Sequence, residues 1–190
     1  MISAEFLLSA SEPQQFPTED LPEIAFLGRS NVGKSSLLNA LAGNRHLAFT
    51  SSTPGRTRSI NFFRVDGKWI FADLPGYGFA KVSRTEQAGW QQLIDSYLTS
   101  RKSLALCLVL LDARRGWMDS DLRLKGWLEH YQKPYTVVAT KVDKLNQKER
   151  NQAERTIRVH FNAGDPLWFS ALTGQGVKEL WQTISKTTTR

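Results

Sequence analysis

The segment GRSNVGKS, residues 28–35, limits the fold of this chain more than any other feature. An apolar run, EIAFLG, leads into it and an apolar helical periodicity begins directly after it, which is the strand-loop-helix order that the pattern GxxxxGK[ST] requires. The glycines at 28 and 33 let the backbone wrap around a phosphate with its N–H groups pointing inward. Lys34 can reach the β- and γ-phosphates and the Ser35 hydroxyl can ligate Mg²⁺. The sequence therefore predicts a phosphate-binding loop between a buried strand and a helix.

Four short apolar runs predict strands that are buried on both faces of a parallel sheet. They read EIAFLG, WIFADLPG, LALCLVLLDA and YTVVATK, and helical periodicities alternate with them. The pair Asp66-Gly67 predicts a hairpin turn and one antiparallel element. The fold class is thus α/β, a three-layer sandwich around a mostly parallel central sheet, with ligands at the carboxyl ends of the strands. The apolar helix faces contain Trp90, Leu93, Ile94, Tyr97 and Leu98; Leu124, Trp127, Leu128 and Tyr131; and Val177, Leu180, Trp181 and Ile184.

Length and composition restrict the class of protein. The chain has 190 residues, enough for one domain with a substantial core. No apolar run approaches the length of about 20 residues that a membrane helix needs, and the N-terminus lacks the features of a signal peptide. The single cysteine, Cys107, lies in the apolar run LALCLVLLDA, which favours a buried and inert thiol. We therefore expect a cytoplasmic protein without a membrane partner.

Charge is distributed unevenly along the chain. The net charge is +7, yet residues 1–23 contain no lysine or arginine. The basic remainder suits a polyanionic partner such as RNA, but a solvated basic surface explains the charge equally well. Among the tryptophans, Trp117 follows the basic pair Arg114/Arg115 and is the weak candidate for an exposed contact. The acidic residues of the first segment are Glu5, Glu12, Glu19, Asp20 and Glu23.

The segment TKVDK, residues 140–144, follows the apolar run YTVVA and distinguishes among nucleotides. Kinases and ATPases use the same phosphate loop, so that loop alone does not identify the base. An aspartate at the end of a strand can accept hydrogen bonds from guanine N1–H and from the exocyclic amine, a pattern that adenine does not offer. Lys141 can lay its aliphatic stem over the base. A lone Lys-x-Asp is usually a solvated charge pair, but downstream of a phosphate loop it indicates GTP.

Three further segments complete the predicted site. In DLPGYG, Asp73 is placed to hold Mg²⁺ through water, and the Gly76 amide could bond the γ-phosphate, so that the following segment orders with GTP and relaxes after hydrolysis. The loop SSTPGRTRS before it offers a threonine hydroxyl to the metal. In FSALTGQG, the backbone amides of Ser170 and Ala171 can meet the guanine oxygen at the end of the last strand.

These motifs, in this order and spacing, resemble the EngB/YsxC/YihA family of bacterial GTPases, which belongs to the TrmE-Era-EngA-EngB superfamily of the TRAFAC class. The resemblance rests on PEIAFLGRSNVGKSSLLNAL, TSSTPGRTRSINFF, DLPGYGFAKV and TKVDKL, and it covers nearly the whole chain. It implies a P-loop GTPase fold, with an N-terminal extension at 1–22, made of an added strand and an acidic segment, and an EngB-type G domain at 23–190. It also implies a cytoplasmic nucleotide switch that acts in assembly of the large ribosomal subunit and is needed for normal cell division and septation.

The resemblance also implies roles for single residues. GTP or GDP is the implied ligand, with Mg²⁺ held by Ser35 and Thr57, and Thr53 is the rival of Thr57. The implied catalytic groups are Lys34, Thr57 and Gly76. The implied GTP-binding residues are Gly28, Arg29, Ser30, Asn31, Val32, Gly33, Lys34, Ser35, Gly55, Arg56, Thr57, Arg58, Ser59, Asp73, Leu74, Pro75, Gly76, Thr140, Lys141, Val142, Asp143, Phe169, Ser170 and Ala171.

Three positions depart from the broad GTPase pattern or refine it. Tyr77 stands where Ras-like proteins place the glutamine that orients water, so we expect slow hydrolysis without a partner. Asn31 occupies the position at which similar potassium-activated GTPases ligate K⁺; it either binds K⁺ or only stabilises the loop, and the sequence leaves both open. Thr140 replaces the usual asparagine, which we interpret as a modest weakening of the contact with guanine.

The implied partner is the large ribosomal subunit or its precursors, with their rRNA and ribosomal proteins, and we expect a monomer that binds no DNA. Two other classes of function compete with this interpretation. A small-molecule kinase or ATPase would need an acceptor pocket and a lid of arginines that the sequence does not reveal, and TKVD would serve no purpose. An RNA-binding protein with a non-hydrolysing nucleotide site is disfavoured by the intact Lys34, Ser35, Asp73 and Asp143.

Overall fold

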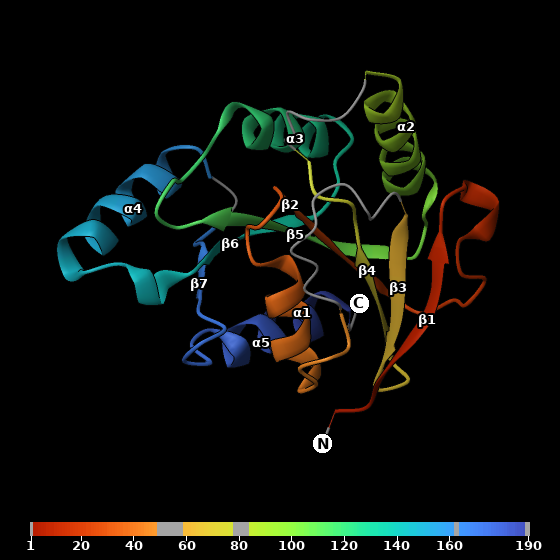
Figure 1. Ribbon diagram of the computed structural model, residues 1–190, viewed down its shortest axis with the longest axis horizontal. Helices are drawn as coiled ribbons and strands as arrows, with labels where there is room; N and C mark the ends of the chain where they lie inside the picture. The colour runs from red at the N-terminus through yellow and green to blue at the C-terminus, as the bar shows by residue number, and fades with distance from the viewer. Residues whose placement is uncertain (1, 49–58, 78–83, 162–163, 189–190) are drawn as a thin grey trace.

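The computed structural model describes residues 2–48, 59–77, 84–161 and 164–188. Within these residues the centre of the molecule is a sheet of seven strands in the order β1-β3-β4-β2-β5-β6-β7 (Figure 1). β3 runs antiparallel to its neighbours β1 and β4, and the remaining neighbours pair in parallel. The strands are β1 (Ala4–Ala10), β2 (Glu23–Gly28), β3 (Ile60–Val65), β4 (Trp69–Asp73), β5 (Leu104–Asp112), β6 (Tyr135–Thr140) and β7 (Leu167–Phe169).

Helices cover both faces of this sheet. In Figure 1, α2 and α3 lie over one face and α1 and α5 over the other, with α4 beside β6 and β7 at one end. The predicted three-layer α/β fold with a mostly parallel sheet is therefore confirmed. The helices are α1 (Lys34–Ala42), α2 (Arg84–Ser100), α3 (Asp119–His130), α4 (Gln147–Val159) and α5 (Val177–Thr188), and two short 3₁₀ turns are η1 (Pro13–Gln15) and η2 (Val142–Lys144).

The four apolar runs form β2, β4, β5 and β6. Successive side chains of these strands point to opposite faces of the sheet, and helices cover both faces, so the runs are apolar throughout. In β5, Val109 packs with the α2 layer and Leu110 with the α1 and α5 layer. The antiparallel element is the β3–β4 hairpin, whose turn residues Asp66 and Gly67 have φ values of 54° and 62°. This positive φ at both positions matches the right-handed twist of the strands, as the sequence predicted.

The predicted apolar helix faces mostly point into the two cores. On α2, Leu93, Ile94, Tyr97 and Leu98 are buried, and on α5, Leu180 and Ile184 are buried with Val177 and Trp181 packed against them. The side chain of Trp90 lies outside the described residues.

Two expectations about aromatic residues were wrong. Tyr131 is 47% exposed and stacks on Trp127 with ring centroids 4.4 Å apart, because it follows the end of α3. Trp117 is not an exposed contact residue. It packs against the core, and its indole N–H donates to the Ile157 carbonyl at 2.9 Å. The predicted burial of Cys107 is confirmed, and burial raises the pKa of its thiol to about 12.

The segment before residue 23 packs on the rest of the molecule. β1 pairs with β3, and Phe16 meets the ring of Tyr97 edge-on at 5.5 Å. Two of its acidic residues pair with one cation, since Arg64 donates to Glu5 at 2.7 Å and through Nε to Glu19 at 3.1 Å. The acidic character of this segment is therefore partly neutralised by the sheet that it extends.

At the amino-terminal edge of the sheet, a buried carboxylate is satisfied by hydrogen bonds from neighbouring side chains. The Glu23 carboxylate is fully buried and accepts hydrogen bonds from the Tyr97 hydroxyl at 2.8 Å, Arg101 Nε at 3.0 Å and the Ser103 hydroxyl at 3.0 Å. These contacts fasten the start of β2 to the end of α2, as a buried carboxylate requires. No helix in the described part of the chain is long and apolar enough to cross a membrane.

Candidate functional site

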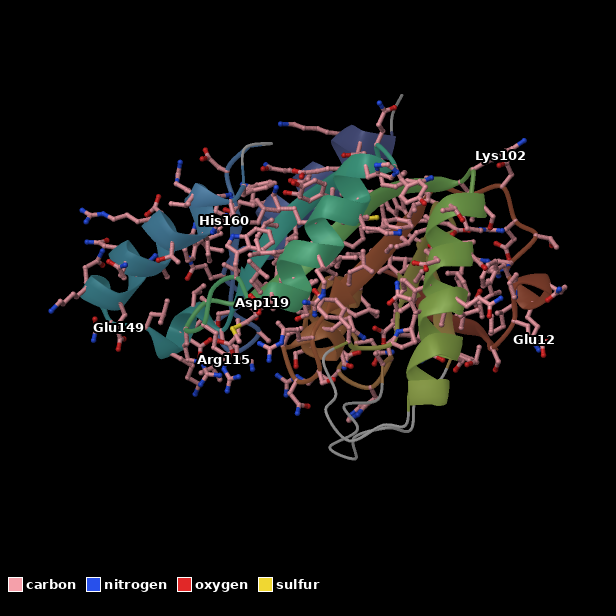
Figure 2. The ribbon with its side chains drawn as sticks, turned by 90° about the horizontal axis from the view of Figure 1, so that it is seen from above. Glu12, Lys102, Arg115, Asp119, Glu149 and His160 are labelled. Atoms are coloured by element: carbon pink, nitrogen blue, oxygen red, sulfur yellow. The ribbon has the colours of Figure 1, made fainter. Side chains whose placement is uncertain are left out.

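The parallel strands β2, β4, β5, β6 and β7 all end at one edge of the sheet. In Figure 2, Lys102, which precedes β5, and Arg115, which follows it, lie on opposite sides of the molecule and mark the two edges. The carboxyl edge brings together segments that are far apart in the sequence, which is where open α/β sheets bind ligands. The last residues of these strands are Gly28, Asp73, Asp112, Thr140 and Phe169.

The predicted phosphate loop joins β2 to α1 and has the backbone that such a loop needs. Asn31 and Gly33 have φ values of 60° and 107°, and Gly33 is the N-cap of α1, so the amino end of the helix dipole opens toward the loop. A Cβ atom on Gly28 would lie 2.8 Å from Val32 Cγ1 and 3.1 Å from Leu110 Cβ. The first glycine of the motif is therefore required by close packing, and the second by its conformation.

The first turn of α1 carries the groups that would meet a polyphosphate and its metal. The Lys34 ammonium pairs with the carboxylate of Asp73, which is 7% exposed at the end of β4. Ser35 is the next residue of the same helical turn, and the hydroxyl of Ser35 and the carboxylate of Asp73 are oxygen donors of the kind that Mg²⁺ prefers. The residues present therefore fit a magnesium ion.

Most of the predicted first switch lies outside the described residues, and this includes Gly55, Arg56, Thr57 and Arg58. Ser59 is described and lies immediately before β3. Its hydroxyl accepts a hydrogen bond from Ser9 of β1 at 2.6 Å, so this part of the site is anchored to the N-terminal strand.

The second predicted switch begins directly beside the phosphate loop. Leu74 and Pro75 are buried, and a Cβ atom on Gly76 would lie 3.1 Å from both the amide nitrogen and the hydroxyl oxygen of Ser30. Tyr77 continues this contact, because its amide donates to the Gly28 carbonyl at 3.3 Å and its carbonyl accepts from Ser30 at 3.2 Å.

The side chain of Tyr77 points to a partner that the sequence did not predict. Its hydroxyl donates to Asp121 Oδ1 at 2.9 Å, on the first turn of α3. Burial and the adjacent carboxylate raise the pKa of Tyr77 far above its usual value, and burial raises the pKa of Asp121. The phenol therefore stays protonated and acts as a hydrogen-bond donor that holds the second switch to α3.

The predicted base-reading segment is joined to the phosphate loop by two side chains. The Thr140 hydroxyl lies 2.6 Å from the Val32 carbonyl and donates to it, and the Lys141 ammonium donates to the Asn31 carbonyl at 2.6 Å. Lys141 has a φ of 61°, a left-handed conformation that turns its side chain back toward the loop. Thr140 thus has a structural role at a position where we had expected only a weaker contact with the base.

Asp143 and the last loop form the far side of the site. The Ser170 hydroxyl donates to Asp143 Oδ1 at 2.7 Å, while the preceding Phe169 is buried and Ala171 is exposed. The Ser170 amide donates to the Gln175 carbonyl at 3.1 Å. The contact of the Ser170 and Ala171 amides with the guanine oxygen stays a prediction, and in this structure the Ser170 hydroxyl orients the Asp143 carboxylate.

Sequence reasoning missed Asp112, the last residue of β5. Its carboxylate accepts hydrogen bonds from Arg114 Nε at 2.9 Å and from Lys141 Nζ at 3.0 Å. Burial acts to raise the pKa of Asp112, but the hydrogen bonds from Arg114 and Lys141 outweigh it and hold the pKa well below its usual value. The signal was present in the sequence, because an aspartate ends the apolar run LALCLVLLDA just as Asp73 ends the run before DLPG.

Comparison with known proteins identifies the family. The model of a family described as 50S ribosome-binding GTPase matches residues 23–141. A protein from Solibacter usitatus, named probable GTP-binding protein EngB, is 56% identical over 186 residues, which cover 98% of this chain and 96% of that protein. A second protein of that name, from Desulfosudis oleivorans, is 46% identical over 188 residues, covering 98% and 95% of the two chains.

A solved structure supports the fold independently of close sequence identity. A crystal structure of a probable GTP-binding protein EngB superposes with a TM-score of 0.73 at 23% identity and covers 87% of this chain and 98% of the other. The kinase interpretation and the non-hydrolysing interpretation find no support in these relatives. The chain therefore belongs to the EngB family of GTP-binding proteins, and it is a P-loop GTPase that hydrolyses GTP to GDP.

Proposed function

We propose that this GTPase is a slow nucleotide switch that acts on the large ribosomal subunit or its precursors. The observation that carries the proposal is the match of residues 23–141 to a family described as 50S ribosome-binding GTPases. The net charge of +7 suits a particle made mostly of RNA. A requirement in cell division and septation, and a cytoplasmic location, belong to the same proposal. Membership of the EngB family supports both.

We further propose how the site holds its ligand. Residues 28–35 cradle the phosphates, Lys34 neutralises their charge, and Ser35 with Thr57 ligates Mg²⁺. Asp143 reads the guanine base and the Ala171 amide faces its oxygen. When bound, the magnesium ion would neutralise charge that develops on the phosphate oxygens during hydrolysis. Slow hydrolysis is expected because the second switch presents Tyr77, whose hydroxyl is bonded to Asp121, in place of a water-orienting amide.

Binding to ribosomal particles tests the proposed partner. We expect the protein with a non-hydrolysable GTP analogue to pellet with purified large subunits through a sucrose cushion, and to pellet at least about fivefold less with GDP, because the switches contact the particle in only one state. Small subunits are the matched control. Equal pelleting with both subunits, or no dependence on the nucleotide, would contradict the proposal and indicate non-specific attraction of a basic protein to RNA.

Potassium dependence tests the two interpretations of Asn31. This residue is exposed and its backbone has a φ of 60°. Its carbonyl accepts a hydrogen bond from the Lys141 ammonium. If the side chain ligates K⁺ beside the phosphates, hydrolysis at constant ionic strength should be about tenfold or more faster in KCl than in NaCl, as expected for added charge stabilisation in the transition state. Equal rates in the two salts would leave Asn31 with a structural role only.

A further inference from the structure

Lys141 crosses from the base-reading segment to the phosphate loop. Its ammonium donates to the Asn31 carbonyl at 2.6 Å, and its Cε lies 3.9 Å from the point that a Cβ atom on Gly33 would occupy. The aliphatic stem therefore runs alongside the loop, where it would lie under a nucleobase held by Asp143. A lysine stem has considerable rotational freedom, and fixing it on binding would cost affinity.

Asp112 supplies the second anchor of this ammonium. Its Oδ2 lies 3.0 Å from Lys141 Nζ, and both carboxylate oxygens also accept hydrogen bonds from Arg114, at 2.9 and 2.6 Å. The Asp112 side chain is only 10% exposed, whereas that of Lys141 is 30% exposed. A nearly buried anion thus holds a more exposed cation, and the anion is itself held by the Arg114 guanidinium, which shares the Oδ2 atom with Lys141.

We propose that Asp112 is a positioning residue for guanine nucleotide binding, which holds Lys141 over the phosphate loop so that its stem is in place before the base arrives. This inference rests on the proposed base site. Asp112 reaches the nucleotide only through Lys141, so its effect should disappear when that side chain is absent. The charge of Asp112 would by itself repel a polyphosphate, and positioning and simple electrostatics therefore predict opposite signs for its removal.

Titration with fluorescent GDP measures this effect. Asp112→Asn keeps the size of the side chain and one acceptor oxygen for Arg114 but removes the charge that anchors Lys141. We expect its dissociation constant for GDP to rise by about five- to tenfold, the range for losing one charge-assisted hydrogen bond. Lys141→Ala should raise it by at least about tenfold, and the double variant should bind like Lys141→Ala alone.

Asp119→Asn is the matched control, because Asp119 is an exposed residue at the start of α3 and its substitution removes the same charge (Figure 2). It should leave GDP affinity within about twofold of the wild type. Unchanged or tighter binding by Asp112→Asn, or a double variant that shows the product of the two single effects, would overturn the inference. If Lys141→Ala binds normally, the proposed base site itself fails.

Lys141→Met provides a second test that leaves Asp112 and Arg114 in place. Its outcome therefore does not depend on whether Asp112→Asn folds. It keeps an apolar stem but has no ammonium to anchor. We expect it to bind GDP about as weakly as Asp112→Asn does. Binding equal to the wild type would show that anchoring of the stem contributes nothing and would also overturn the inference.

Discussion

Replacing Asp143 by asparagine is expected to lower the affinity for GDP by at least about a hundredfold, while the affinity for xanthosine diphosphate rises. The carboxylate can accept two hydrogen bonds from guanine, one from N1–H and one from the exocyclic amine, and each is charge-assisted. Asparagine presents one acceptor and one donor, which match the N1–H and the carbonyl oxygen of xanthine. The Ser170 hydroxyl, 2.7 Å from Asp143 Oδ1, can still orient the acceptor oxygen in the variant.

Equilibrium competition against fluorescent GDP, with unlabelled GTP, ATP and xanthosine triphosphate, measures this change. The gain of xanthine binding is the decisive readout, because an unfolded variant cannot produce it. Asp165→Asn is a suitable control, since that exposed carboxylate pairs with Arg158 of α4. The assignment of TKVD would be wrong if ATP displaces the fluorescent nucleotide from the wild type as well as GTP does, or if the variant keeps its preference for guanine.

Features that depend on local sequence were predictable. The phosphate loop and the β3–β4 turn at Asp66-Gly67 each arise from residues within a few positions of one another. The two-sided burial of the parallel strands was equally clear, since their apolar runs lack polar alternation. These signals sufficed for the fold class and for most of the candidate site.

Contacts between distant segments were not predictable. The pairs Lys141–Asp112 and Tyr77–Asp121 are 29 and 44 residues apart, and they form only because the strand order places β5 between β2 and β6 and sets α3 beside the second switch. Trp117 is a similar case, because its position after two arginines suggested exposure while its actual partner, Ile157, comes from α4. Hydrophobic periodicity determines which face of an element is buried, but it does not identify the neighbour.

Replacing Gly176 by alanine is expected to lower the free energy of unfolding by about 3 kcal/mol or more. A Cβ atom at this position would lie 2.2 Å from the Trp168 carbonyl oxygen, and the backbone φ is +86°, so both space and conformation exclude a side chain. The oxygen belongs to β7 and cannot turn away as a flexible side chain would. Because β7 ends at Phe169 and leads directly into Ser170, the variant should also bind GDP more weakly. Urea denaturation and GDP titration measure the two effects.

Alanine variants of two further glycines separate the effect of the clash with Trp168 from the effect of backbone conformation. Gly174 has a φ of +76°, but no atom lies within 4 Å of the point that a Cβ atom would occupy, so Gly174→Ala should lose only about 1 kcal/mol through backbone strain. Gly126 lies in α3 with open space and ordinary helical φ, so Gly126→Ala should gain about 0.5–1 kcal/mol. If Gly176→Ala and Gly174→Ala lose equal stability, conformation alone requires the glycine. A larger loss at Gly176 would mean that the close approach of β7 to the start of α5 fixes the loop that contains Ser170 and Ala171.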